Sequence, residues 1–199
     1  ILLSVFAGTA DILVSGIKGC NVTLSCESED REIVSIDLSR LKSIISCQNE
    51  KCESKSENGR VFKEGSCNMI IKDLRFSDAG KYILRVHYTN DQTELERQTL
   101  EYQLCIHDEI SVKKGEELKL DVLLINADKV VHWAKRSTGR KEDWSRSHGV
   151  RRDRMTIRDR NLIINNFTAT DAGTYEVLDS EGEILIMITV TGERRSMDE

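Results

Sequence analysis

The chain has 199 residues, of which 39% are apolar and 32% are charged, and its formal net charge is -5. This balance is enough to bury a core in one large or two small domains, and it excludes a chain that is basic overall and coats nucleic acid. No apolar run approaches 18 residues, so the sequence predicts no membrane-spanning helix. All six cysteines lie between residues 20 and 105, an asymmetry that favours two domains.

The first ten residues, ILLSVFAGTA, form an apolar run that ends in small residues. Two interpretations fit residues 1 to 10: the end of a secretory signal peptide that is cleaved after Ala10, or the first β-strand of the mature chain. The signal-peptide interpretation implies an oxidising compartment, in which the six cysteines form disulfides.

An internal repeat is the most informative feature of the sequence. Residues 60 to 82 read RVFKEGSCNMIIKDLRFSDAGKY, and residues 154 to 175 read RMTIRDRNLIINNFTATDAGTY. Each copy has an Arg, an alternating apolar strand, a turn and the motif D-A-G-x-Y. The Arg and the Asp are 18 residues apart in the first copy (Arg60, Asp78) and 17 apart in the second (Arg154, Asp171).

Alternation of apolar and polar residues continues upstream of each copy. The apolar face of residues 20 to 26 holds both cysteines, and Asn21 falls on the opposite, solvent-facing side. Residues 118 to 124 alternate in the same way. Short half-buried strands with turns between them predict an all-β, antiparallel sandwich.

The D-A-G-x-Y motif with its upstream Arg resembles the immunoglobulin fold, in both halves and over nearly the whole chain. The resemblance implies two tandem immunoglobulin-like sandwiches, variable-like over residues 11 to 108 and intermediate-type over 109 to 191, with residues 192 to 199 starting a stalk. It also implies structural roles for several residues. These are the tyrosine corners Tyr82 and Tyr175, the pairs Arg60–Asp78 and Arg154–Asp171, and a core tryptophan on strand C, Trp133.

Both halves depart from the immunoglobulin pattern at the bridge between strands B and F. The strand-F positions two residues after each corner tyrosine are Leu84 and Val177, and the strand-B positions are Cys26 and Val122. Neither domain can therefore form the usual inter-sheet disulfide, and the second domain is expected to have a Val–Val contact in its place.

Six cysteines allow 15 connectivities, and the sequence alone does not choose among them. The resemblance makes strands B and E neighbours, which implies a Cys26–Cys67 bridge. The five-residue step from Cys47 to Cys52 suits a staple in a hairpin between strands C and C′, which leaves Cys20 to pair with Cys105. A zinc site is the competing interpretation of the cysteines, and the lack of a C-x-x-C pair argues against it.

No enzyme signature is present in the sequence. There is no G-x-S-x-G, no H-E-x-x-H and no phosphate-binding glycine loop. The four histidines are scattered, and alternation predicts that His132 faces solvent on strand C. We therefore predict a protein that is not an enzyme and has no catalytic, metal or cofactor site.

A basic stripe lies in the second half, where residues 129 to 160 hold 11 Lys and Arg against four acids. An exposed Trp144 among these charges would suit a membrane headgroup or a protein partner, whereas the plainer interpretation is a solvated face with Trp144 packed on the sheet. In the first half, the loop between strands F and G is the second candidate contact site. The candidate ligand residues are Arg140, Lys141, Trp144, Arg146, Arg151 and Arg152, with Tyr88, Asn90 and Asp91 in the loop.

More narrowly, the first domain with extra cysteines and the second without any resemble the diverse immunoglobulin domain-containing proteins of bony fish. That resemblance implies an innate immune receptor ectodomain at the cell surface, or a secreted form, that recognises a protein or lipid ligand without catalysis. Anionic phospholipid is the implied lipid.

The alternative is a homophilic or heterophilic adhesion receptor like the signalling lymphocytic activation molecule family. In that family, the face of strands G, F and C in the first domain pairs with a like domain, which would make a homodimer. Sequons at Asn21 and Asn166 predict a glycoprotein in either case.

Overall fold

The computed structural model describes residues 11–28, 31–56, 58–89 and 95–193, and within these ranges the fold is built from β-strands with two single-turn 3-10 helices. The chain divides into two compact units. The first comprises mainly Gly19–Leu74 and Gly80–Leu104, and the second mainly the residues from Cys105 onward, together with Gly16–Lys18 and Arg75–Ala79. The signal-peptide question concerns residues 1 to 10, which lie outside the described residues.

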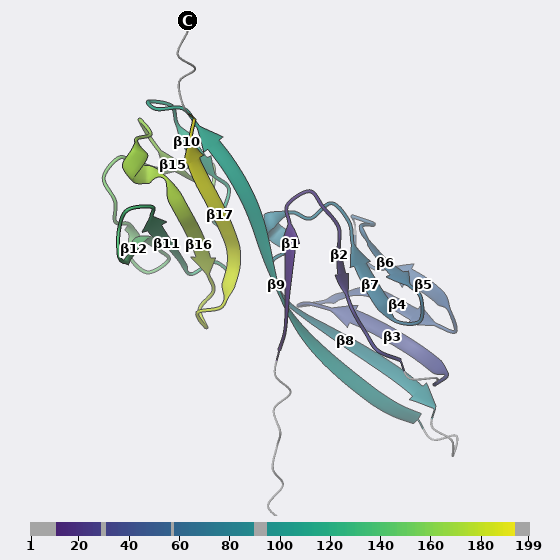
Figure 1. The fold of residues 1–199 in the computed structure, drawn as a ribbon. Coiled ribbons are helices and arrows are strands. Elements are labelled where there is room, and N and C mark those ends of the chain that lie inside the picture. The colour runs from purple at the N-terminus through teal and green to yellow at the C-terminus, as the bar shows by residue number, and fades with distance from the viewer. Residues whose placement is uncertain (1–10, 29–30, 57, 90–94, 194–199) are drawn as a thin grey trace, which may run out of the picture. The chain divides into compact units, whose positions relative to one another are not determined.

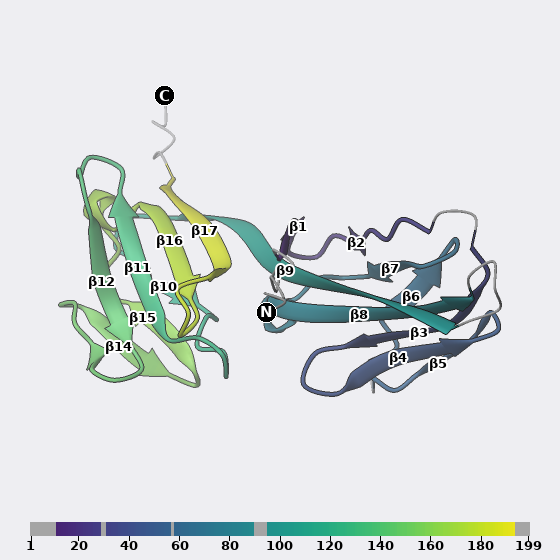
Figure 2. The same cartoon turned by 90° about the horizontal axis from the view of Figure 1, so that it is seen from below.

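The first unit is a sandwich of a five-stranded and a three-stranded sheet (Figures 1 and 2). The larger sheet has the order β9(Leu95–Val112), β8(Gly80–Thr89), β3(Ile33–Ser39), β4(Ser43–Gln48), β5(Lys51–Ser54), and β1(Ile12–Ile17) also pairs with β9. The smaller sheet has the order β2(Val22–Leu24), β7(Asn68–Ile71), β6(Val61–Glu64). The 3-10 helix η1(Phe76–Asp78) precedes β8.

The core of the first unit forms because alternate residues of each sheet are apolar and point to the other layer. Leu24, Met69 and Leu84 are fully buried, and Leu84 occupies the strand-F position where immunoglobulin domains usually have a cysteine. Tyr102 is also buried, and its hydroxyl donates a 2.5 Å hydrogen bond to the carbonyl of Ser25 just after β2. Burial raises the pKa of this phenol to about 12.

Two disulfides are present in the first unit. Cys26–Cys67 joins the residues just beyond β2 and just before β7, so this bridge stays within one layer instead of crossing between the sheets. Cys47–Cys52 links residues that face each other on β4 and β5. The prediction placed this disulfide in the hairpin between strands C and C′, which is the β3–β4 hairpin. It lies instead in the next hairpin along the chain, between β4 and β5.

The predicted Cys20–Cys105 bridge is wrong, since both thiols are free. Cys20 is exposed, and its carbonyl accepts a hydrogen bond from the amide of Leu74, which holds it at the end of the smaller sheet of the first unit. Cys105 lies in the second unit and is half-buried, with its sulfur 3.7 Å from Nε2 of His107.

The second unit is also a two-layer sandwich. Its larger sheet has the order β13(Gly149–Val150), β12(Arg140–Ser145), β11(Lys129–Ala134), β16(Gly173–Leu178), β17(Ile184–Gly192), followed by the C-terminal part of β9, which pairs in parallel with β17. Its smaller sheet has the order β10(Leu118–Leu120), β15(Asn161–Ile164), β14(Met155–Arg158), and η2(Ala169–Asp171) precedes β16. Val122 and Val177 are fully buried at the positions of the missing disulfide.

The two tryptophans have opposite environments. Trp133, expected in the core, is 40% exposed, whereas Trp144 is 7% exposed, as in the plainer of its two interpretations, in which it packs on the sheet. His132, expected to face solvent, is buried. The physical reason is the parity of β11: Val130 faces Val177 in the core, so the residue two positions later, His132, points inward and Trp133 points outward.

Apart from the parallel pair of β9 and β17, the strands pair in antiparallel fashion, and their order within each unit is that of an immunoglobulin-like sandwich. β9 runs without interruption through Asp108, where the domain boundary is predicted, and that boundary stays a prediction. At the other end, β17 extends to Gly192, and the stalk expected over residues 192 to 199 stays a prediction. In the described part of the chain, no helix has the length and hydrophobicity needed to cross a membrane.

Candidate functional site

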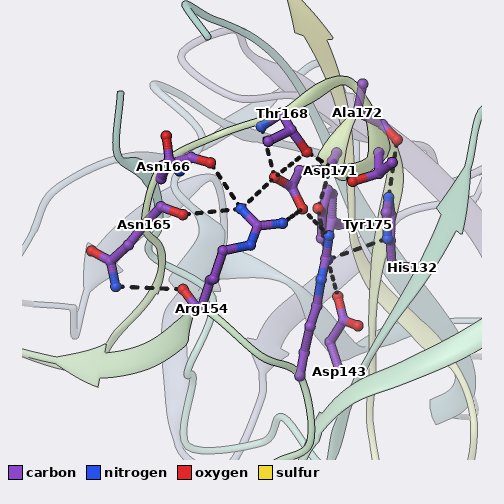
Figure 3. A network of polar contacts seen from close by, with 11 residues as sticks. His132, Asp143, Arg154, Asn165, Asn166, Thr168, Asp171, Ala172 and Tyr175 are labelled. Carbon is purple, nitrogen blue, oxygen red and sulfur yellow. Dashed lines mark hydrogen bonds and ion pairs between the residues drawn. The ribbon is translucent and has the colours of Figure 1, made fainter. Parts of the chain in front are cut away.

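A buried polar network in the second unit is centred on Asp171, at the end of η2 (Figure 3). The carboxylate accepts two 3.0 Å hydrogen bonds from the guanidinium of Arg154, another from Arg152, and one of 2.8 Å from the amide of Thr168. Asp171 itself is completely inaccessible to solvent. The Arg154–Asp171 pair that the repeat indicated is therefore joined by a second arginine that sequence reasoning had assigned to a ligand surface.

Arg152 connects Asp171 to the larger sheet. Its guanidinium donates to the carboxylate of Asp143 (2.8 Å), to the hydroxyl of Tyr175 (3.1 Å) and to Nδ1 of His132 (3.3 Å). The hydroxyl of Tyr175 in turn donates a 2.6 Å bond to the carbonyl of Asp171, the geometry of a tyrosine corner. Because Arg152 has all these partners and its side chain is only 18% exposed, it is not a surface cation.

The environment shifts several pKa values in this network. Burial raises the pKa of Asp171, but hydrogen bonds from Arg154 and Thr168 and the two arginine charges outweigh it, so the net shift is downward. Burial lowers the pKa of His132 and raises that of Tyr175. Burial also raises the pKa of Asp143, against the opposing charge of Arg152.

Each charged or ring group in this network is engaged by neighbours from the same unit, so the network joins β11, β12 and β16 to η2 and has a structural role. In the part of the chain that the structure describes, no group of three or more His, Cys, Asp or Glu side chains could hold a metal ion. In the first copy of the repeat, the Arg60–Asp78 pair stays a prediction, and other contacts of these two residues are described. Arg60 donates to the carbonyls of Lys72 and Asp73, and Asp78 accepts from the amide of Arg75.

The predicted basic stripe is largely used within the protein. Arg146 donates to three backbone carbonyls between residues 124 and 127, Arg151 pairs with Glu142 at 3.1 Å, and Arg140 pairs with Glu176 at 2.6 Å. Trp144 is buried and Arg152 is bound in the Asp171 network. The other four candidates stay exposed, so ligand binding by the stripe remains a prediction. Of the six candidates in the second unit, exposed Lys141 is the one that makes neither an ion pair nor a side-chain hydrogen bond with the described residues.

The outer face of the five-stranded sheet in the first unit is the second candidate site. Ser46, Asp37, Arg85 and Thr99 lie in register across β4, β3, β8 and β9. Alternation puts this row on the face away from the core, and each of its side chains is only half-exposed. This row is therefore the middle of a continuous polar surface.

One ion pair lies at the centre of that face. The guanidinium of Arg85 is 4.0 Å from the carboxylate of Asp37 and donates a 3.1 Å bond to the hydroxyl of Ser39. The hydroxyl of Ser43 donates a 2.5 Å bond to the same aspartate. Ile83, beside Ser39, adds an aliphatic contact surface.

The predicted loop site is described only in part. Tyr88 is the penultimate residue of β8, and Arg31 lies over its ring at 4.6 Å. Asn90 and Asp91 lie outside the described residues. Both sequon asparagines are exposed. Asn21 lies just before β2, in the layer opposite the five-stranded sheet, and its side-chain carbonyl accepts a 3.1 Å bond from the amide of Asp73. A glycan at Asn21 would therefore leave the five-stranded face uncovered.

Comparisons with known proteins found similarity among solved structures only. No protein-family model and no curated protein matches the chain. Among solved structures, CD84 of the SLAM family is 23% identical over 49% of this chain and 97% of that one, with a TM-score of 0.44. The amphioxus IgVJ-C2 molecule is 16% identical over 87% and 95% of the two chains, with a TM-score of 0.41. Murine CEACAM1b is 14% identical over 92% and 99%, with a TM-score of 0.40. These neighbours are immunoglobulin-superfamily domains.

Proposed function

We propose that the chain is the ectodomain of a cell-surface adhesion or immune-type receptor that recognises another immunoglobulin-type domain, in the simplest case a second copy of itself. The observation that carries this proposal is the outer face of β9, β8, β3, β4 and β5. It is a broad sheet surface whose central Arg85–Asp37 pair is flanked by the short polar side chains of Ser39, Ser43, Ser46 and Thr99.

The face is also electrically balanced. On this face, the cations Lys81, Arg85 and Arg97 are matched by the anions Asp11, Asp37 and Glu101. Lys81 lies 3.3 Å from Asp11 and 3.8 Å from Glu101. In an isologous pairing, each residue meets the counterpart surface of the other copy, so Arg85 of one molecule can contact Asp37 of the other. A surface with both signs in the same small area is complementary to itself, which supports a homophilic contact.

An anionic phospholipid ligand has less support. That interpretation depended on an exposed Trp144 and on Arg151 and Arg152. Trp144 is buried, Arg151 is paired with Glu142, and Arg152 is bound to Asp143 and Asp171. Extracellular location, glycosylation at Asn21 and Asn166 and the narrower likeness to the fish receptors stay predictions.

A charge-swap experiment tests the proposal. We expect the purified chain to self-associate reversibly in sedimentation velocity, and Asp37→Arg or Arg85→Asp alone to abolish this association. An equimolar mixture of the two variants should associate again, because each supplies the charge that the other lacks. Glu64→Arg, on exposed β6 in the opposite layer, makes the same charge change as Asp37→Arg and is the matched control.

Two results would contradict the proposal. One is that the chain stays monomeric at every concentration tested and that cells expressing it do not adhere to one another. The other is self-association that Glu64→Arg weakens as much as Asp37→Arg does. Either result would remove the five-stranded face from the recognition mechanism.

A further inference from the structure

The hairpin formed by β11 and β12 in the second unit carries uncompensated positive charge. Residues 129 to 141 include five cations and no acid. The turn between the two strands contains Lys135 and Arg136, both exposed, and the exposed Lys141 follows Arg140 on β12. Figure 2 shows the two strands side by side in the second unit, joined by this turn.

Neighbouring acids do not neutralise this charge. Glu176, on the adjacent strand β16, is bound to Arg140, and Glu142 is bound to Arg151. Within the described residues, neither Lys135, Arg136 nor Lys141 makes an ion pair. A local cluster of unpaired cations attracts anions even though the chain as a whole is acidic.

An aromatic ring lies next to these cations. Trp133 faces Arg140 across the hairpin, and the guanidinium of Arg140 lies over the indole at 5.2 Å. With 40% of its surface exposed, Trp133 offers a flat apolar platform on the outer face of the sheet. Sequence reasoning missed this arrangement because it assigned Trp133 to the core.

We propose that the β11–β12 hairpin binds a linear sulfated polysaccharide. Lys135 and Arg136 in the turn contact sulfate groups, and the ring of Trp133 packs against a sugar ring. Lys141 is in register with His132, so it lies on the other face of the hairpin and contacts a sulfate group there. Clusters of Lys and Arg of this density are typical of sites for heparin-like polyanions. The site lies in the other unit from the proposed recognition face and does not depend on it.

The geometry favours a glycan over the two other classes of anionic partner. The turn between Ala134 and Arg140 is Lys-Arg-Ser-Thr-Gly, so it has no apolar side chain to enter a bilayer. Trp133 lies on the sheet, with Arg140 over its ring, and not at the tip of the hairpin. A peptide partner would usually anchor apolar side chains in pockets, and the residues of this turn offer none.

The test uses the whole chain and a heparin-derived octasaccharide at physiological ionic strength. The two tryptophans of the chain are Trp133 and Trp144, so intrinsic fluorescence reports directly on the hairpin. We expect quenching of the exposed Trp133 on binding, and loss of that signal in Trp133→Phe. Affinity should fall with added salt, because bound cations release counterions from the polymer.

Matched triple variants locate the site. Lys135→Ser with Arg136→Ser and Lys141→Ser should weaken octasaccharide binding by about tenfold or more, since three charge contacts are removed. Lys113→Ser with Lys114→Ser and Lys119→Ser removes the same charge from exposed positions of the same unit and should change the affinity less than about threefold. All six residues are exposed, so both triple variants are expected to fold, and their thermal unfolding is measured first.

Several results would overturn the proposal. The first is that the octasaccharide does not bind, and the second is that both triple variants weaken its binding equally. The third is that polyglutamate binds as tightly as the octasaccharide, which would make the site a general anion patch. Equal binding to vesicles of phosphatidylcholine and phosphatidylserine would assign the hairpin to a membrane surface instead. Preference for the octasaccharide over both probes, lost in the hairpin variant alone, supports the proposal.

Discussion

His132 stacks on Tyr175, with ring centroids 4.2 Å apart and planes within 8° of parallel. Nδ1 of the same imidazole is 3.3 Å from a guanidinium nitrogen of Arg152, and Nε2 is 3.1 Å from the carbonyl of Ala172. A guanidinium can only donate and a carbonyl can only accept, so this arrangement requires the neutral tautomer with its proton on Nε2. Protonation of Nδ1 would replace a hydrogen bond by a contact between two cations.

The second unit should therefore lose stability in mild acid. Burial lowers the pKa of His132 from its ordinary value of 6.5, so the folded state favours the neutral ring. The contribution to stability is complete above pH 6.5, and it is lost as the pH falls below 6.5 toward the pKa of the folded state. Asp143, Asp171 and Arg152 surround the ring, so their variants would move the transition. Denaturant unfolding followed by tryptophan fluorescence from pH 8 to pH 5 measures the effect on this unit.

The variant His132→Gln separates this effect from the other three histidines. It keeps a donor and an acceptor but does not titrate, so unfolding between pH 8 and pH 5 should become less steeply dependent on pH. An unchanged pH dependence in His132→Gln would show that another group is responsible.

Removing the carboxylate of Asp171 should be far more costly than removing an exposed ion pair. Asp171→Asn leaves Arg152 and Arg154 without their shared anion inside the protein, which costs about 3–5 kcal/mol in comparable buried pairs. Glu117→Gln removes the partner of Arg158 at the surface and should cost less than about 1 kcal/mol. Urea unfolding of both variants gives the two free energies, and similar values would contradict a central role for Asp171.

Much of this fold could be predicted from the repeat. D-A-G-x-Y with its upstream Arg located the corner Tyr175 and the Arg154–Asp171 pair, because these residues are fixed by a short turn of constant geometry. The facing of strand β11 could not be predicted in the same way. Shifting the alternation of a strand by one residue moves every side chain to the opposite face of the sheet. Trp133 was expected in the core, but its neighbour His132 occupies that position.

The role of Arg152 was also beyond sequence reasoning. Arg151 and Arg152 are adjacent in a basic segment, and nothing local distinguishes the one that pairs with exposed Glu142 from the one that enters the network. The distinction arises because Asp143 and Asp171, far apart in sequence, both face the second arginine. Long-range pairing of this kind becomes visible only once the two sheets are packed.

Gly173 should tolerate no side chain. A Cβ at this position would lie 2.0 Å from the carbonyl oxygen of Trp133, and its φ of +131° is a conformation that other residues rarely adopt. Gly173→Ala is therefore expected to destabilise the second unit by more than about 3 kcal/mol. Gly139→Ala, in the hairpin turn, meets no atom within 4 Å and is the control. Equal stability of the two variants would mean that β16 shifts away from β11.

The two disulfides should contribute unequally to the stability of the first unit. Cys26–Cys67 closes a separation of 41 residues and Cys47–Cys52 one of only 5. Chain entropy alone predicts about 4 kcal/mol for the longer loop and about 2 kcal/mol for the shorter one. Paired serine variants, Cys26→Ser with Cys67→Ser and Cys47→Ser with Cys52→Ser, compared by urea unfolding followed by circular dichroism, test this order. A larger loss for the second pair would contradict it.

The remaining two thiols should react at different rates with a disulfide reagent. Cys20 is exposed, whereas burial, together with the charge of Glu176, raises the pKa of half-buried Cys105 to about 11. Since the thiolate is the nucleophile, Cys105 should react slowly at pH 8 and Cys20 rapidly. Titration of the native chain is expected to show one fast and one slow thiol, and Cys20→Ser should remove the fast phase only. Absence of both thiols in the native chain, with two recovered after reduction, would mean that Cys20 and Cys105 are bonded.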